Sequence, residues 1–161
     1  MDFKVERVVE AGRALGIAVE PHRFPEGTRT AADAAAAVGC EIGQIVKSLV
    51  FGSERGPLLF LVSGANRLDV DLAATVAGAT DLHKADAEEA RRATGFSIGA
   101  TPPFGHPEHI PTFMDEDLLS FSEVWAAAGR DDSVFGVSPV SLRDAIGATV
   151  TSLAETSSRE R

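Results

Sequence analysis

Two apolar segments near the middle of the chain constrain the fold more than any other feature of the sequence. Residues 44–51 and 58–63 are rich in β-forming apolar residues, and the turn-like Gly52-Ser53-Glu54-Arg55-Gly56-Pro57 separates them. This pattern predicts two neighbouring strands joined as a hairpin. Because both segments are apolar on both faces, the sheet that holds them should be covered on both sides.

The elements around this hairpin are expected to be short. Helical spacing and capping signals, such as Thr30 with Asp33 and Asp86 with Glu89, predict helices at 3–15, 30–38, 69–78, 86–94 and 139–146. Further strands are expected at 17–24, 112–114, 123–127, 134–137 and 148–153. Between them, residues 95–111 hold three glycines and four prolines, which excludes a regular helix.

The order of these elements indicates a mixed α/β fold. The strands do not alternate regularly with long helices, so a doubly wound parallel sheet is not expected. We expect a curled, barrel-like mixed sheet surrounded by short helices. A chain of 161 residues suits one core, so residues 1–154 are predicted to form one domain, followed by a polar, frayed tail at 155–161.

The charge and cysteine content limit the classes of function. A net charge of −9, from 15 basic and 24 acidic residues, argues against broad non-specific binding to nucleic acid but leaves room for a small basic pocket that grips one RNA end. The N-terminus lacks the apolar core of a secretory signal, and no apolar run approaches the roughly 20 residues that span a bilayer. The single cysteine, Cys40, indicates a reducing cytoplasm.

Lys47 is the strongest single candidate for chemistry. Strand alternation places it on the face of Ile45, Leu49 and Phe51, while Ser48 takes the opposite face. An ammonium in an apolar strand must reach water, an anion or a carboxylate, because burying it unpaired is costly. The spacing alone fits either a snorkelling lysine or a ligand-binding cation.

The loop at residues 99–105 is the second candidate. Glycine lets the backbone approach a ligand closely, and Pro102 and Pro103 can hold the loop rigid so that its free N–H groups are aimed at an oxygen in advance. The two prolines donate no N–H themselves. An ordinary turn-rich connection also fits this pattern.

Other reactive side chains carry weaker signals. His106 and His109 are expected at the surface, since their spacing lacks the further ligands of a zinc site. Cys40 is expected to be inert, and Asp131 and Asp132 to lie in a solvated turn. The alanine-rich segment 31–37 is interpreted as helix packing. We therefore expect neither a metal nor a cofactor.

Taken in order, several short motifs resemble the YbaK and prolyl-tRNA synthetase editing-domain family over roughly residues 3–153. The motifs are Ile45-Val46-Lys47-Ser48-Leu49-Val50-Phe51, Val62-Ser63-Gly64, Asn66-Arg67-Leu68-Asp69, Thr94-Gly95-Phe96, Gly99-Ala100-Thr101-Pro102-Pro103, Ala128-Gly129-Arg130 and Ser138-Pro139.

The resemblance implies hydrolysis of the ester that joins an amino acid to the 3′ end of tRNA. It assigns Lys47 to the phosphate of the RNA end and Gly99 to a loop that positions the substrate carbonyl, with a ribose hydroxyl and a water assisting. Substrate contacts are expected from Ser48, Ser63, Ala100, Thr101, Pro102 and Pro103.

The expected function is that of a trans-acting aminoacyl-tRNA deacylase. Its substrate is expected to be tRNA for proline that carries alanine, serine, threonine or cysteine, and a synthetase is a possible partner. No membrane or DNA is expected to bind. The alternatives are a non-catalytic module that binds a charged tRNA end or a nucleotide, and an interaction domain in which Lys47 and the loop are structural.

Overall fold

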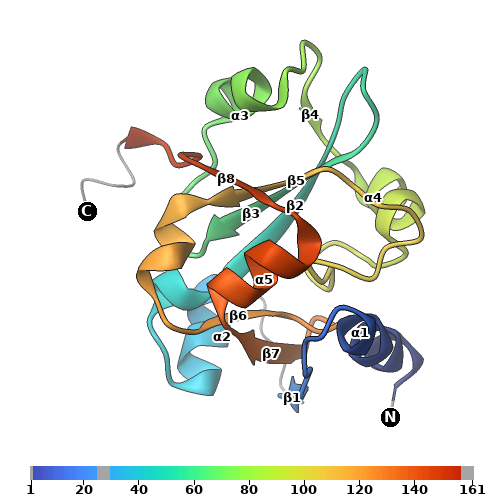
Figure 1. The fold of residues 1–161 in the computed structure, drawn as a ribbon, viewed down its shortest axis with the longest axis vertical. Helices are drawn as coiled ribbons and strands as arrows, with labels where there is room; N and C mark the ends of the chain where they lie inside the picture. The colour runs from blue at the N-terminus through green and yellow to red at the C-terminus, as the bar shows by residue number, and fades with distance from the viewer. Residues whose placement is uncertain (1, 25–29, 157–161) are drawn as a thin grey trace.

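The computed structural model describes residues 2–24 and 30–156, which form two sheets flanked by helices (Figure 1). The α-helices are α1 (Phe3–Ala14), α2 (Ala31–Val38), α3 (Val70–Ala77), α4 (Ala87–Thr94) and α5 (Pro139–Ile146), with 3-10 turns at Ile42–Gln44 and Glu116–Ser120. The strands are β1 (His22–Arg23), β2 (Val46–Gly52), β3 (Leu58–Ser63), β4 (His83–Lys84), β5 (Thr112–Asp115), β6 (Val124–Ala127), β7 (Ser133–Val137) and β8 (Thr149–Thr151).

Local hydrogen bonds explain why the short helices begin where they do. Thr30, Asp69, Asp86 and Ser138 each accept a hydrogen bond from the N–H group three residues further on, as N-cap residues do. The capping box expected at Asp86 has only one of its two hydrogen bonds. Asp86 accepts from the Glu89 N–H, while the Glu89 carboxylate lies 3.1 Å from His83 Nε2. The predicted positions of these helices are confirmed to within about two residues.

The larger sheet has the strand order β4-β2-β3-β5-β8 and mixes both directions. Strands β2 and β3 form the predicted antiparallel hairpin, with Lys47 opposite Val62 and Phe51 opposite Leu58. Strand β5 runs parallel to both β3 and β8. The central strand β3 is buried along its whole length, which confirms that this sheet is covered on both sides.

The two faces of β2 and β3 contribute to two separate apolar clusters. Val46, Val50, Leu59 and Leu61 pack with residues of the smaller sheet in one cluster, while Phe51 and the remaining β3 side chains pack near α3 in the other. Every second residue therefore belongs to the same cluster, as the pleat of a strand requires.

The smaller sheet is antiparallel, with the order β1-β7-β6, and Figure 1 shows it between α1 and α2. A single parallel bridge from Ile45 to Trp125 links it to the start of β2. The two sheets are not closed into a barrel, so the expected barrel-like core is replaced by two sheets that share one apolar cluster.

Strand β1 is shorter than the predicted strand at 17–24. Pro21 has no N–H to donate to a partner, and Ile17 and Val19 serve instead as buried core residues on an extended segment. Only His22 and Arg23 pair with β7. Of the predicted tail, residues 157–161 lie outside the described residues.

Over residues 2–24 and 30–156, no helix has the length and apolar character needed to cross a membrane.

Candidate functional site

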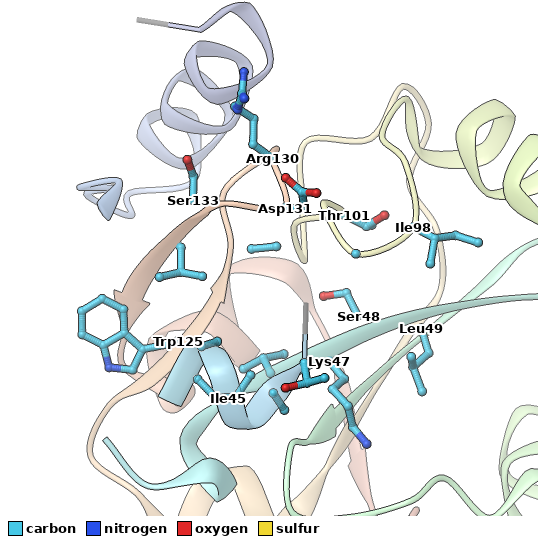
Figure 2. A pocket seen from close by; sticks show the side chains of 17 residues that line it. Ile45, Lys47, Ser48, Leu49, Ile98, Thr101, Trp125, Arg130, Asp131 and Ser133 are labelled. Carbon is cyan, nitrogen blue, oxygen red and sulfur yellow. The ribbon is translucent and has the colours of Figure 1, made fainter. Parts of the chain in front are cut away.

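A cavity of about 340 Å³ opens where the two sheets diverge (Figure 2). Strand β2 forms its floor, the loop around Gly99 forms one wall, and α2 with strands β6 and β7 forms the other. The lining residues are Thr30, Ala31, Ala34, Ile45, Val46, Lys47, Ser48, Leu49, Ile98, Gly99, Thr101, Trp125, Ala127, Arg130, Asp131, Ser133 and Val134. Segments that are far apart in the sequence thus share one hollow.

Alternation along β2 sends two adjacent side chains to opposite sides of the strand. In Figure 2 the Ser48 hydroxyl points toward the loop that carries Thr101, and the Lys47 ammonium points away from that loop. Lys47 lines both this cavity and a second hollow on the other face of the sheet. The predicted separation of Lys47 and Ser48 is confirmed.

The hydroxyl of Ser48 is buried, and it finds no hydrogen-bond partner within the described part of the chain. A buried polar group without a partner costs about 1–3 kcal/mol. Such a group calls for an explanation. Ser48 lines the cavity, but its Oγ has almost no accessible surface, so the hydroxyl reaches a ligand or a water held there only when its side chain turns toward the cavity.

Lys47 is fixed at the rim of the cavity by a relay of hydrogen bonds. Its Nζ donates to the carbonyl oxygen of Asn66, and the Asn66 side-chain amide donates to Asp115 at 2.9 Å and to Asp117 at 2.7 Å. Burial lowers the pKa of Lys47, the nearby Arg67 lowers it further, and Asp115 opposes this shift. The Lys47 ammonium is thus half-buried and held in place by its hydrogen bond to Asn66 O, with Asp115 as a nearby opposite charge.

The loop around Gly99 has two backbone N–H groups without a partner among the described residues. The Ala100 N–H donates to Ser97 O at 3.0 Å, and the Thr101 hydroxyl donates to the same oxygen at 3.1 Å. Of the non-proline residues at 99–101, only Gly99 and Thr101 keep backbone N–H groups without a partner within residues 2–24 and 30–156. These two donors could bind a carbonyl oxygen or an oxyanion.

Gly99 has a φ of +88°, a backbone conformation that favours glycine. A Cβ added there would meet no described atom within 4 Å, so it would project into open space. The positive φ, rather than a close approach to another part of the protein, therefore favours glycine at this position.

The other predicted contact residues lie behind the cavity wall. Ala100, Pro102 and Pro103 are buried and do not line the cavity. Ser63 is also absent from the lining, since its hydroxyl donates to Gly43 O at 2.7 Å and its N–H donates to Asp115. The structure thus places Lys47, Ser48, Gly99 and Thr101 around one cavity, whereas the other four predicted contact residues do not line it.

Several lining residues had no signal in the sequence. The alanine-rich segment packs as expected, since Ala34 and Ala35 are buried against Ile45 with Ala31 beside them, and Ala31 and Ala34 also line the cavity. Their small side chains leave the space that the cavity occupies. Trp125 borders the same wall through the bridge to Ile45. The sequence around Ala31 and Ala34 does not show that they lie near Trp125, and the sequence around Trp125 does not show that it lies near α2.

Asp132 is also not the solvated residue that the sequence suggested. It is buried, with Arg130 Nε at 3.0 Å and Arg23 Nε at 3.2 Å. Burial by itself raises the pKa of this carboxyl, but hydrogen bonds from Arg130 and Arg23 outweigh it and hold the pKa below its usual value. This cluster anchors the turn that carries Asp131 to the edge of the cavity.

His106 is half-buried rather than exposed, and its Nε2 lies 2.9 Å from Pro102 O. Burial lowers the pKa of this imidazole. His109 is exposed as predicted. No histidine is among the residues that line the cavity, and in the described part of the chain no group of three or more His, Cys, Asp or Glu side chains could hold a metal.

Residues 25–145 match the family described as the aminoacyl-tRNA editing domain. A solved structure described as a candidate trans-editing enzyme for prolyl tRNA synthetase is 46% identical, with a TM-score of 0.92 over 96% of this chain and 99% of that chain. EbsC of Enterococcus faecalis, named as a candidate Cys-tRNA(Pro)/Cys-tRNA(Cys) deacylase, is 25% identical over 77% of this chain and 82% of its own length.

The proline–tRNA ligase of Limosilactobacillus fermentum is 28% identical over 65% of this chain, which spans only 19% of that longer protein. The similarity therefore concerns one part of the ligase.

Two serines of this region should respond in opposite ways to loss of the hydroxyl. Ser48→Ala removes a buried hydroxyl that has no described partner, so the free energy of unfolding should stay the same or rise by up to about 1 kcal/mol. Ser63→Ala leaves Gly43 O without its donor and should lower the free energy of unfolding by about 1–3 kcal/mol. Urea unfolding of both variants measures the difference. An equal loss in both would mean that Ser48 has a structural partner.

Proposed function

The chain belongs to the aminoacyl-tRNA editing domain family, and we propose how its cavity performs the chemistry of that family on mischarged tRNA. The protein is a trans-acting aminoacyl-tRNA deacylase, an enzyme that hydrolyses the ester between an amino acid and tRNA. Its similarity over nearly the full length of a candidate trans-editing enzyme supports action on tRNA released by a synthetase.

The observation that carries the proposal is the convergence of three kinds of group on one cavity. Lys47 supplies a cation, Gly99 and Thr101 supply backbone N–H donors, and Ser48 supplies a buried hydroxyl. An aminoacyl ester at the end of an RNA offers a phosphate, a carbonyl oxygen and a ribose hydroxyl. The chemistry of the cavity is therefore complementary to that of the substrate.

We propose that water is the nucleophile. A serine needs an adjacent base to attack an ester, and the Ser48 hydroxyl is bonded to no basic group in the described part of the chain. Water adds to the carbonyl carbon, and the N–H groups of Gly99 and Thr101 stabilise the oxyanion. The carbon–oxygen bond to the ribose then breaks, the ribose oxygen takes a proton, and a free amino acid and an uncharged tRNA remain.

Ser48 is placed to orient the reacting water or the neighbouring ribose hydroxyl. Its hydroxyl can both donate and accept, and the described protein groups leave it unused. Lys47 lies one residue away but on the other side of β2, where it can bind the phosphate of the terminal nucleotide without entering the reaction centre.

The relatives described above support a small amino acid as the group removed, since one is named for Cys-tRNA. The apolar part of the cavity lining, which includes Ala31, Ala34, Trp125 and Val134, would receive such a side chain. A synthetase pocket cannot strongly reject a residue that is smaller than its own substrate, so a second site that sorts by size is needed. We propose tRNA for proline charged with alanine, serine, threonine or cysteine as substrate, and recognition of its acceptor end.

A panel of charged tRNAs tests this proposal. We expect the purified protein to release at least one of alanine, serine, threonine or cysteine from tRNA for proline faster than it releases proline. Lys47→Ala should slow this reaction by roughly ten- to a hundredfold, as loss of a charge-assisted hydrogen bond of about 1.5–3 kcal/mol predicts.

Lys47→Met, which keeps the apolar stem of the side chain, controls for loss of packing, and thermal melting controls for the fold. Fastest removal of proline, equal rates on all five tRNAs, or wild-type rates in both folded lysine variants would contradict the proposal.

Gly99→Ala tests the role of the loop, with Gly56→Ala as a matched control. Gly99 and Gly56 have φ values of +88° and +93°, and neither has a described atom within 4 Å of an added Cβ. Both variants should therefore lose a similar stability of about 1–2 kcal/mol. Only Gly99→Ala should slow deacylation, by about tenfold or more, because its methyl group enters the cavity and shifts an oxyanion donor. Equal deacylation rates in the two variants would show that this loop takes no part in the reaction.

A further inference from the structure

A second hollow of about 630 Å³ lies on the face of β2 opposite Ser48. It shares Lys47 and Leu49 with the cavity described above, so the two hollows meet at the edge of β2. Its walls are formed by the segment after β3 and by β4. We call it the lysine groove, after Lys47 and Lys84, which both line it.

The charge of the lysine groove is the reverse of the charge of the whole protein. The chain has a net charge of −9, and its only lysines are Lys4, Lys47 and Lys84. Two of these three, together with Arg67, line the groove, whereas Glu155 is the one carboxylate among its lining residues in the described part of the chain. A local excess of cations on an acidic protein favours an anionic ligand at this place.

Lys47 and Lys84 reach the groove from backbone positions that lie well apart. Lys84 lies opposite Phe51 in the pairing of β4 with β2, and Phe51 is four residues from Lys47. Four residues of a strand span about 13 Å. The two lysines can therefore contact successive phosphates of an RNA strand.

We propose that the lysine groove binds the phosphodiesters of the single-stranded 3′ end of tRNA that precede the terminal adenosine. This inference rests on the proposed function, because the ester must lie in the cavity beside Ser48 while the strand leaves it past Lys47. Lys47 then marks the junction between the reacting nucleotide and the strand behind it. Lys84 and Arg67 bind the phosphates further along the groove.

Lys84 offers the clearest test because its side chain is exposed and it is not among the residues that line the 340 Å³ cavity. The variants are Lys84→Gln, which removes the charge, and Lys84→Glu, which reverses it. Arg13→Gln is the matched control, since Arg13 is an exposed cation on α1 that pairs with Glu10 and does not line the groove.

For mischarged tRNA, kcat/KM should fall about tenfold in Lys84→Gln and further in Lys84→Glu, as loss of a charge-assisted phosphate contact predicts. The change should lie in KM, with kcat within about twofold of wild type, because Lys84 does not touch the reacting atoms. The slope of log kcat/KM against log salt should become shallower by about 0.7 in Lys84→Gln, the value for one lost contact to a single strand. Arg13→Gln should match the wild type.

A binding measurement separates failure of the groove from failure of the proposed function. A fluorescent single-stranded RNA that ends in CCA should bind Lys84→Gln about tenfold more weakly than Arg13→Gln, whether or not any ester is hydrolysed. If the wild type deacylates tRNA but Lys84→Gln and Lys84→Glu match Arg13→Gln in KM, salt slope and RNA binding, the groove proposal is wrong. A fall in kcat with KM unchanged would also contradict it.

Discussion

The pleat of one strand organises the whole site. Strand β2 packs against apolar clusters on both faces, so its alternate residues must belong to two different surroundings, one between the two sheets and one beneath α3. Where β2 borders the cavity, this alternation turns Ser48 toward the cavity and Lys47 toward the lysine groove. A hydroxyl for the reaction centre and a cation for the RNA are thereby held by adjacent residues of one rigid element.

Local signals in the sequence were enough to predict most of the elements, although strand β4 had no such signal. The two-sided hairpin, the capped helices and the irregular segment at 95–111 depend on neighbouring residues, and the structure has them as expected. Lys47 and Gly99 stood out because a cation in an apolar strand and a glycine beside prolines are unusual locally. Their meeting in one cavity depends on contacts across about 50 residues of sequence, which no local pattern encodes.

What the sequence did not predict also depends on contacts between residues that lie far apart in the chain. Ser48 and Ser63 look alike in the sequence, yet only the fold places Gly43 O beside Ser63 and nothing described beside Ser48. Small residues suit both packing and a cavity wall, so the sequence could not show that Ala31 and Ala34 do both. Asp132 pairs with Arg23, which lies 109 residues away in the sequence. The division of the strands into two sheets, rather than one closed barrel, likewise depends on long-range pairing.

The most direct test of this account is a crystal structure with an unreactive amide analogue of alanyl-adenosine that carries a 5′ phosphate. The account predicts the analogue's carbonyl oxygen within hydrogen-bond distance of the Gly99 and Thr101 N–H groups, its methyl side chain against Ala34, and its phosphate on Lys47 Nζ. An analogue that binds with its amino acid in the lysine groove, or with its phosphate away from Lys47, would contradict the division of roles between the two faces of β2.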